Sequence, residues 1–121
     1  MRDNVVHVRI VSPLVTRGFR KLEDLKAIEY PGISISHAEI ATGPGSIESE
    51  FEAAMSVPGT LVEILRAERE GVDAVIIDCM GDPGLRAARE LSGMLVAGPC
   101  QTGMHVASML GHKFSVITVM R

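Results

Sequence analysis

The stretch VIIDCMGDPGLRAARE, from Val75 to Glu90, decides the fold class of this chain. It opens with a continuous apolar run, which is typical of a strand covered on both faces of its sheet. A Gly-Asp-Pro-Gly turn follows and leads into a helix, with Asp82 predicted as its N-cap and Pro83 as its first helical residue. A buried strand that passes through a tight turn into a helix is the repeating unit of a parallel α/β sheet.

The same alternation of strands and helices extends from this stretch in both directions. The predicted strands are Val5–Val11, Ile33–Ile40, Ala74–Ile77, Met94–Pro99 and Phe114–Met120, with a helix between each consecutive pair, the first at Arg20–Tyr30 and the last at Cys100–Gly111. We therefore predict one α/β domain over residues 1–121: a doubly wound, mostly parallel five-stranded sheet with helices on both faces. No helix follows the last predicted strand, so we expect another chain, or a further part of a longer protein, to cover it.

The longest predicted helix has recognisable signals at both ends. Ser46 or Ser49 is expected as its N-cap, and Gly71 suits the left-handed residue just beyond its last turn. Its apolar face is predicted to contain Leu61, Ile64, Leu65 and Ala67.

The composition excludes several classes of function. A length of 121 residues suits one domain, and 46% hydrophobic with only 3% aromatic residues predicts an aliphatic core. A net charge of −3 argues against nucleic acid as a main partner. No apolar run approaches the roughly 18 residues that span a bilayer, and the first residues do not form a secretory signal. The two cysteines form neither a disulfide framework nor a zinc motif, so we expect a reduced, cytoplasmic protein.

Three segments are predicted to meet at one edge of the sheet, because ligands of parallel sheets bind beyond the carboxyl ends of the strands. They are Ser12–Thr16 (SPLVT), Thr42–Ser49 (TGPGSIES) and Cys79–Gly84 (CMGDPG). The TGPGS loop is either a flexible turn or a cradle whose backbone N–H groups grip a carboxylate or imide oxygen. The substrate-binding candidates in these segments are Ser12, Thr16, Gly43, Ser46, Met80 and Gly81.

Cys79 is either a small buried hydrophobe or a working thiol. It lies where its strand leaves the sheet, and it precedes a predicted helix N-terminus, whose N–H groups and dipole lower the pKa of a thiol. A thiolate at that position could abstract a proton or attack a carbonyl. Cys100, at the end of the next predicted strand, is either a second thiol or a residue buried beneath the helix that follows it.

The segment DAVIIDCMGDPGLRAARE (Asp73–Glu90) resembles the hydantoin racemase branch of the aspartate/glutamate racemase superfamily. GPGSIES upstream and VAGPCQTGMHVASMLGHKFSVIT downstream resemble the same branch, and the match is collinear over nearly the whole chain. Proteins of this kind have two α/β halves that face a cleft. The resemblance covers the first half only.

The resemblance implies a cofactor-independent, PLP-independent isomerase that racemises an amino acid or hydantoin next to a carbonyl. Each half of such a protein contributes one cysteine: one thiolate takes the proton from one face of the carbon, and the other thiol returns a proton to the opposite face. By this match Cys79 is the first thiol. The second would lie in a half that begins after Arg121, and Cys100 does not replace it by alignment.

Departures from the family pattern leave the substrate class open. Ser12 and Leu14 stand where the family usually carries asparagines, and Gln101 stands where the branch often has Glu. The alternatives are a malonate-type decarboxylase or diacid cis–trans isomerase on the same fold, and a non-catalytic binding or assembly module. The expected small-molecule partner is a carboxylate or a hydantoin-like compound. We also expect a homo-oligomer, or pairing with another chain through the uncovered last strand. Nucleic acid and membrane are not expected.

Overall fold

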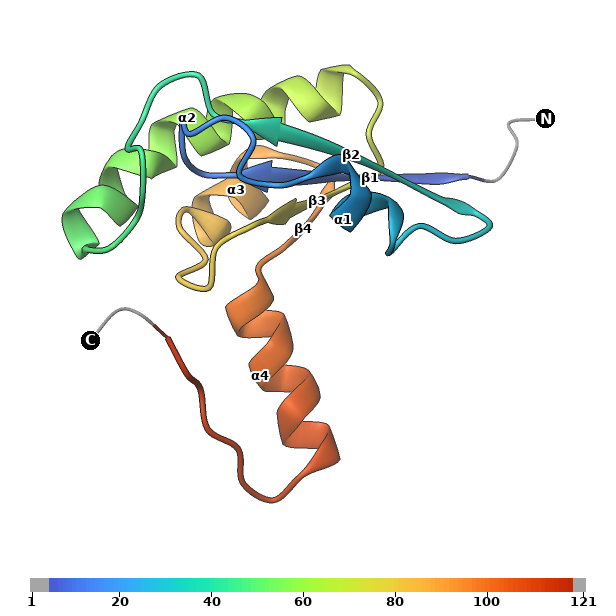
Figure 1. The fold of residues 1–121 in the computed structure, drawn as a ribbon, viewed down its shortest axis with the longest axis vertical. Coiled ribbons are helices and arrows are strands. Elements are labelled where there is room, and N and C mark those ends of the chain that lie inside the picture. Colours follow the sequence, from blue (N-terminus) through green and yellow to red (C-terminus); the bar gives the residue numbers. More distant parts are fainter. Residues whose placement is uncertain (1–4, 119–121) are drawn as a thin grey trace.

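Four parallel strands form the sheet at the centre of the molecule, in the order β2-β1-β3-β4 (Figure 1). The computed structural model describes residues 5–118. Its elements are β1 (Val6–Ser12), α1 (Leu22–Lys26), β2 (Ile33–Glu39), α2 (Glu50–Arg69), β3 (Ala74–Ile77), α3 (Leu85–Leu91), β4 (Leu95–Ala97) and α4 (Pro99–Leu110). The predicted α/β fold with a parallel sheet is therefore confirmed.

The strand order places a ligand crevice at the end of β1. The strand β1 pairs in parallel with β2 on one side and with β3 on the other, so the chain reverses its direction across the sheet between β2 and β3. Because crossover connections are right-handed, α1 lies on one face and both α2 and α3 lie on the other. In agreement, α1 packs on β2, while α2 packs on β1, β3 and α3. In doubly wound sheets such a reversal opens a crevice beyond the carboxyl ends of the strands.

The core lies between the sheet and the pair α2 and α3. Strand residues Val11, Val75 and Ile77 are fully buried there, and Ile64 and Ala67 of α2 pack against them. Two further residues of the predicted apolar face of α2, Leu61 and Leu65, are only partly buried. The core is aliphatic, as the composition predicts.

The helix α2 begins and ends at predicted signals and continues through a proline. Ser49 is the N-cap, and its hydroxyl oxygen accepts a hydrogen bond from the Glu52 N–H at 3.3 Å. Gly71, with φ of 77°, follows the C-cap. Pro58 removes one helical N–H donor, and nearby hydroxyls bond to carbonyls of the same region: Thr60 donates to the Ser56 carbonyl oxygen at 2.8 Å.

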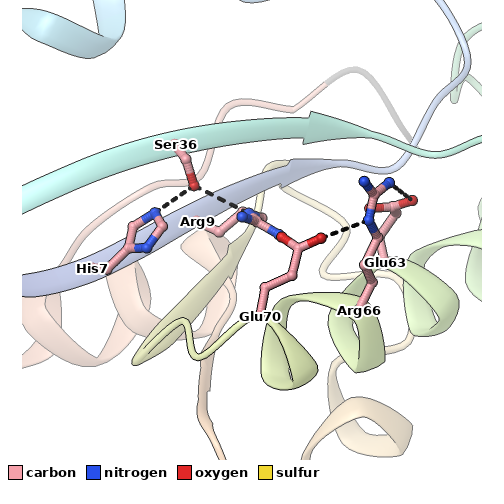
Figure 2. A network of polar contacts seen from close by, with 6 residues as sticks. All are labelled: His7, Arg9, Ser36, Glu63, Arg66 and Glu70. Carbon is pink, nitrogen blue, oxygen red and sulfur yellow. Dashed lines mark hydrogen bonds and ion pairs between the residues drawn. The ribbon is translucent and has the colours of Figure 1, made fainter.

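A polar network fastens α2 to the sheet (Figure 2). Ser36 of β2 joins His7 at 2.7 Å and accepts from Arg9 Nε at 3.1 Å, both on β1. Arg9 Nη1 donates to Glu70 Oε2 at 2.6 Å, and Glu70 also accepts from Arg66 at 2.8 Å. The hydrogen bond from Arg9, followed by that from Arg66, lowers the pKa of Glu70. These bonds tie β1 and β2 to the C-terminal end of α2.

Two local predictions are wrong at helix ends. The first helix spans only Leu22–Lys26, and Ile28, which was predicted inside it, is 54% exposed. Asp82 does not cap α3, and Pro83 is not its first residue, because the N-cap is Gly84 in the left-handed conformation with φ of 73°. Asp82 itself has φ of 46°, which directs the chain through a turn before the helix begins.

The fifth strand is not present in the described part of the chain. Residues 114–118 form no strand, and residues 119–120 of the predicted strand lie outside the described residues. The reason is the course of α4, which extends away from the sheet and has no buried residue (Figure 1). The segment after α4 returns beside that helix, where Phe114 and Val116 line a hollow with Met104. A strand needs a neighbouring strand for its backbone N–H and C=O groups, and this segment does not reach β4.

Candidate active site

A cavity of about 950 Å³ opens at the carboxyl ends of β1 and β3. The loop after β1 contributes Leu14 and Thr16, the loop before α2 contributes Ser46, and the loop after β3 contributes Cys79 and Met80. The three segments that the strand-end rule brings together therefore enclose one space.

Two hydrogen bonds hold the first two loops together at the rim. The Val15 N–H donates to the Pro44 carbonyl oxygen at 3.0 Å, and the Thr16 hydroxyl donates to the Gly45 carbonyl oxygen at 2.6 Å. Because these bonds join residues far apart in sequence, they fix the cavity wall opposite the loop after β3.

Cys79 is half-buried and lines the cavity two residues beyond the end of β3. The Asp78 N–H donates to the Val11 carbonyl oxygen at 2.8 Å, so the chain is still held beside β1 at this point. The Asp82 N–H then donates to the Cys79 carbonyl oxygen at 3.0 Å and closes a turn. The thiol is thus presented from a fixed backbone rather than from a free loop.

The surroundings of Cys79 raise the pKa of its thiol, contrary to the sequence-based expectation. Burial is the main cause, the nearby charges of Asp78 and Asp82 act in the same direction, and a hydrogen bond from the Gly81 backbone opposes them. The expected lowering fails because a turn through Gly84 separates Cys79 from the start of α3. At neutral pH the thiol is consequently protonated to a greater extent than a free cysteine, so it is ready to donate a proton and must first ionise before it can remove one.

Asp78 is the centre of a polar cluster behind the thiol. Arg20 Nε and Nη2 donate to the two oxygens of its carboxylate, each at 2.6 Å. The fully buried Ser12 hydroxyl donates to Asp78 Oδ2 at 3.3 Å, and Ser12 Oγ lies 2.8 Å from His37 Nε2. Since the hydroxyl proton is directed to Asp78, His37 Nε2 is the donor in the last bond. The hydrogen bonds that Arg20 donates to Asp78 also raise the pKa of Arg20.

Asp82 caps α4 instead of α3. Its carboxylate accepts from the Cys100 N–H at 3.0 Å and from the Gln101 N–H at 2.7 Å. Gly98 leaves the necessary space, because a Cβ at that position would lie 2.4 Å from the Asp82 carboxyl carbon. The turn after Cys79 and the start of α4 are therefore joined.

The predicted site residues divide into three groups. Cys79, Thr16, Ser46 and Met80 line the cavity. Ser12 lies behind it in the Asp78 cluster, and Gly81 contacts the thiol through its backbone. Gly43 does not belong to the cavity: it lines a separate apolar hollow against α2, next to Phe51 and Met55.

Cys100 lies apart from the cavity that contains Cys79. It occupies the first turn of α4, is half-buried, and lines the hollow between α4 and the segment after it. The predicted burial beneath its helix is only partial. Within residues 5–118, Cys79 is the only cysteine that lines the cavity, and no group of three or more His, Cys, Asp or Glu residues could hold a metal ion.

Comparison with known proteins identifies the family. The Asp/Glu/hydantoin racemase family matches residues 20–121. The chain belongs to this family. It is 38% identical to the hydantoin racemase of Pseudomonas sp. (strain NS671) over 120 residues, which cover 93% of the chain and 46% of that protein. It is also 38% identical to the hydantoin racemase of Rhizobium meliloti over 117 residues, which cover 95% of the chain and 48% of that protein.

A solved structure shows the same fold. Allantoin racemase from Klebsiella pneumoniae superposes with a TM-score of 0.75 at 33% identity, covering 86% of this chain and 43% of that one. The chain thus spans about half the length of the curated relatives that it matches. In the described part of the chain, no helix is both long enough and apolar enough to cross a membrane.

Sequence reasoning missed Arg20 and His37. Arg20 is 58 residues from Asp78 in the chain, and His37 is 25 residues from Ser12. No motif links these pairs. The one available signal was the strand alternation, which places His37 and Ser12 on the same sheet face when β1 and β2 pair in the observed register.

Proposed function

We propose that this chain forms the Cys79-bearing half of a cofactor-independent racemase, in which the thiol moves a proton at a carbon next to a carbonyl. The observation that carries this proposal is the position of Cys79 at the carboxyl end of β3, lining the cavity within the segment that matches the racemase family. Family membership supports racemase chemistry, and the geometry supplies a candidate for the acid/base group.

Proton removal and the stabilisation of the resulting enolate each have candidate groups in the cavity. The Cys79 thiolate removes the α-proton, and the electron pair moves into the adjacent carbonyl. The oxygen of the resulting enolate needs hydrogen-bond donors. Thr16 and Ser46 place hydroxyls on the opposite wall. In the free cavity the Thr16 hydroxyl donates to the Gly45 carbonyl oxygen and the Ser46 hydroxyl to Glu48 Oε1, so each must turn to the enolate oxygen when the substrate binds. The protonated Cys79 can then return its proton to the face from which it took it.

Inversion requires a second acid/base group on the opposite face of the carbon. The relatives named hydantoin racemase are about twice as long as this chain. We propose that the missing group comes from a further half, either on a longer polypeptide or on a paired copy. The substrate is a small carboxylate or hydantoin-like molecule, and a reducing compartment such as the cytoplasm would keep both cysteines as thiols.

The test is exchange of the α-hydrogen in heavy water, followed by NMR on both enantiomers of 5-substituted hydantoins, aspartate and glutamate. Wild type is compared with Cys79→Ser, and Cys100→Ser is the matched control. We expect exchange of one enantiomer without inversion, lost in Cys79→Ser and kept in Cys100→Ser. Exchange that survives in Cys79→Ser would contradict the assignment.

One observation favours a second candidate, a binding or assembly module without turnover. Within residues 5–118, the cavity holds one thiol and no second cysteine. Such a module would melt at a higher temperature with a bound ligand, yet exchange no hydrogen. The solution mass of the chain, measured by light scattering, distinguishes a paired copy from a monomer. Formation of a decarboxylated or isomerised diacid in the same NMR experiment would indicate the other chemistries of the fold.

A further inference from the structure

The Asp78 carboxylate is the immediate chain neighbour of Cys79 and is only 15% exposed. Arg20 approaches it from the loop before α1, with both guanidinium donors at 2.6 Å from separate carboxylate oxygens. The Arg20 Cζ atom also lies 5.5 Å from the centre of the Phe19 ring. A bidentate pair with a flanking aromatic ring is the geometry in which arginine, unlike lysine, binds a carboxylate tightly.

The charges around Cys79 are mostly negative. Asp78 and Asp82 lie on its own loop, and Glu48 lines the same cavity from the loop before α2. The backbone N–H groups of Cys100 and Gln101, at the start of α4, donate to the Asp82 carboxylate. The titratable side chains on that helix are Cys100 and His105. His37 is separated from Asp78 by Ser12. Among the residues described, Arg20 is the one cation that lines the cavity.

An unpaired carboxylate beside a thiol disfavours the thiolate, because the two negative charges repel each other in a partly desolvated site. A carboxylate whose charge is offset by a guanidinium repels much less. Asp78 and Arg20 form such a pair in this chain, and both line the same cavity as Cys79.

We propose that Arg20 is a positioning residue for Cys79: by holding and neutralising Asp78, it makes a negatively charged sulfur tolerable at this site. Its value to the reaction rests on the proposed function, since only a thiol that must ionise needs this partner. Arg20 acts through Asp78, and the proposal requires no contact between Arg20 and a substrate.

The test follows the thiol itself and needs no turnover. In a Cys100→Ala background, alkylation of Cys79 by iodoacetamide is measured across about pH 6.5 to 9.5, because only the thiolate displaces iodide. The reagent is neutral, so the charge of Arg20 does not attract it. The variants are Arg20→Gln, Arg20→Lys, Asp78→Asn and the double variant Arg20→Gln with Asp78→Asn. Arg17→Gln is the matched control, because it removes an exposed cation from the same loop and lies outside the cavity.

We expect Arg20→Gln to slow alkylation about threefold to tenfold near pH 7.5 and to move the titration midpoint upward. Asp78→Asn should speed alkylation, because it leaves Arg20 as an unopposed cation. The double variant should return close to the wild-type rate, since both charges are then absent. Arg20→Lys should fall between wild type and Arg20→Gln, and Arg17→Gln should match wild type.

An unchanged profile in Arg20→Gln would overturn the proposal, as would a double variant as slow as Arg20→Gln. The second result would mean that Arg20 acts through structure alone. If Arg20→Gln fails to fold, judged by circular dichroism, the near-isosteric Asp78→Asn decides the matter: an alkylation rate no faster than wild type contradicts the proposal. The alkylation rates do not depend on the outcome of the hydrogen-exchange experiment. The comparison of wild type with Cys79→Ser tests the proposed function, whereas the comparison of wild type with Arg20→Gln tests the role of Arg20.

Discussion

The carboxylate of Asp82 accepts a hydrogen bond from the backbone N–H of Gln101 at 2.7 Å, and so ties the turn beyond Cys79 to the first turn of α4. The same carboxylate accepts from Cys100 at 3.0 Å, which satisfies two of the N–H groups that a helix leaves unpaired at its start. One side chain therefore couples the site loop to a helix that has no buried residue.

Replacing Asp82 should test that coupling. Asp82→Ala removes the cap of α4 and places a residue with a Cβ but no polar side chain at φ of 46°. We expect a loss of about 1–3 kcal/mol in the free energy of unfolding, from the cap and the left-handed backbone together. Asp82→Asn keeps an acceptor and tolerates that backbone, so it should lose less. Urea unfolding followed by circular dichroism measures both, and Glu90→Ala on an exposed site is the control.

Alanine substitutions at two glycines, Gly98 just before α4 and Gly103 within it, should change the stability of the chain in opposite directions. A Cβ at Gly98 would lie 2.4–2.7 Å from atoms of the Asp82 carboxyl group, so Gly98→Ala must displace the cap. We expect it to destabilise the chain by about 1–3 kcal/mol. Gly103, inside α4, has nothing within 4 Å of the same position, and Gly103→Ala should stabilise the helix by up to about 1 kcal/mol. Equal melting temperatures for the two variants would contradict the assigned cap.

The contrast between β3 and the expected fifth strand shows what the sequence could predict. The run Ala74–Ile77 is a strand with the predicted bounds: it pairs with β1, and Val75 and Ile77 are buried while Ala74 and Ile76 are partly buried. The segment from Phe114 has an equally suitable local composition but forms no strand over residues 114–118. Pairing is a non-local property, and the direction taken by α4 decides it.

The candidate site likewise has one part that the sequence predicts and one part that depends on non-local contacts. The meeting of three loops around Cys79 follows from the rule for strand ends, so it was predictable from the order of elements. The partners of Asp78 were not, because Arg20 reaches it across 58 residues of sequence. The pKa of the thiol was predicted in the wrong direction, since proximity in sequence to a helix start did not translate into proximity to its N–H groups.

The network around Glu70 should make stability depend on acid. The hydrogen bonds from Arg9 and then Arg66 lower the pKa of Glu70, so the folded state holds its proton more weakly than the unfolded chain. The stability that this carboxylate contributes is therefore present above its ordinary pKa and is lost as the pH falls through the lowered value. Glu70→Gln should show a smaller loss of melting temperature between about pH 5 and pH 3 than wild type. The same change at Glu23, an exposed residue of α1, should leave that acid dependence intact.

The raised pKa of Cys79 should be visible in both reactivity and stability. Because burial favours the thiol form, the folded state binds the proton of Cys79 more tightly than the unfolded chain does. Cysteines of an unfolded chain ionise at about pH 8.5. The stability from this residue is present below that pH and declines as the pH rises through the raised folded value. The free energy of unfolding of Cys79→Ser should therefore fall less between about pH 8 and pH 10 than that of wild type.

The same raised pKa should be seen directly in the ultraviolet absorbance of the thiolate. In a Cys100→Ala background, the midpoint of this titration should lie above that of free cysteine. A midpoint below that of free cysteine would show that the helix α3 dominates after all, and would restore the effect that its N-terminus was first expected to have.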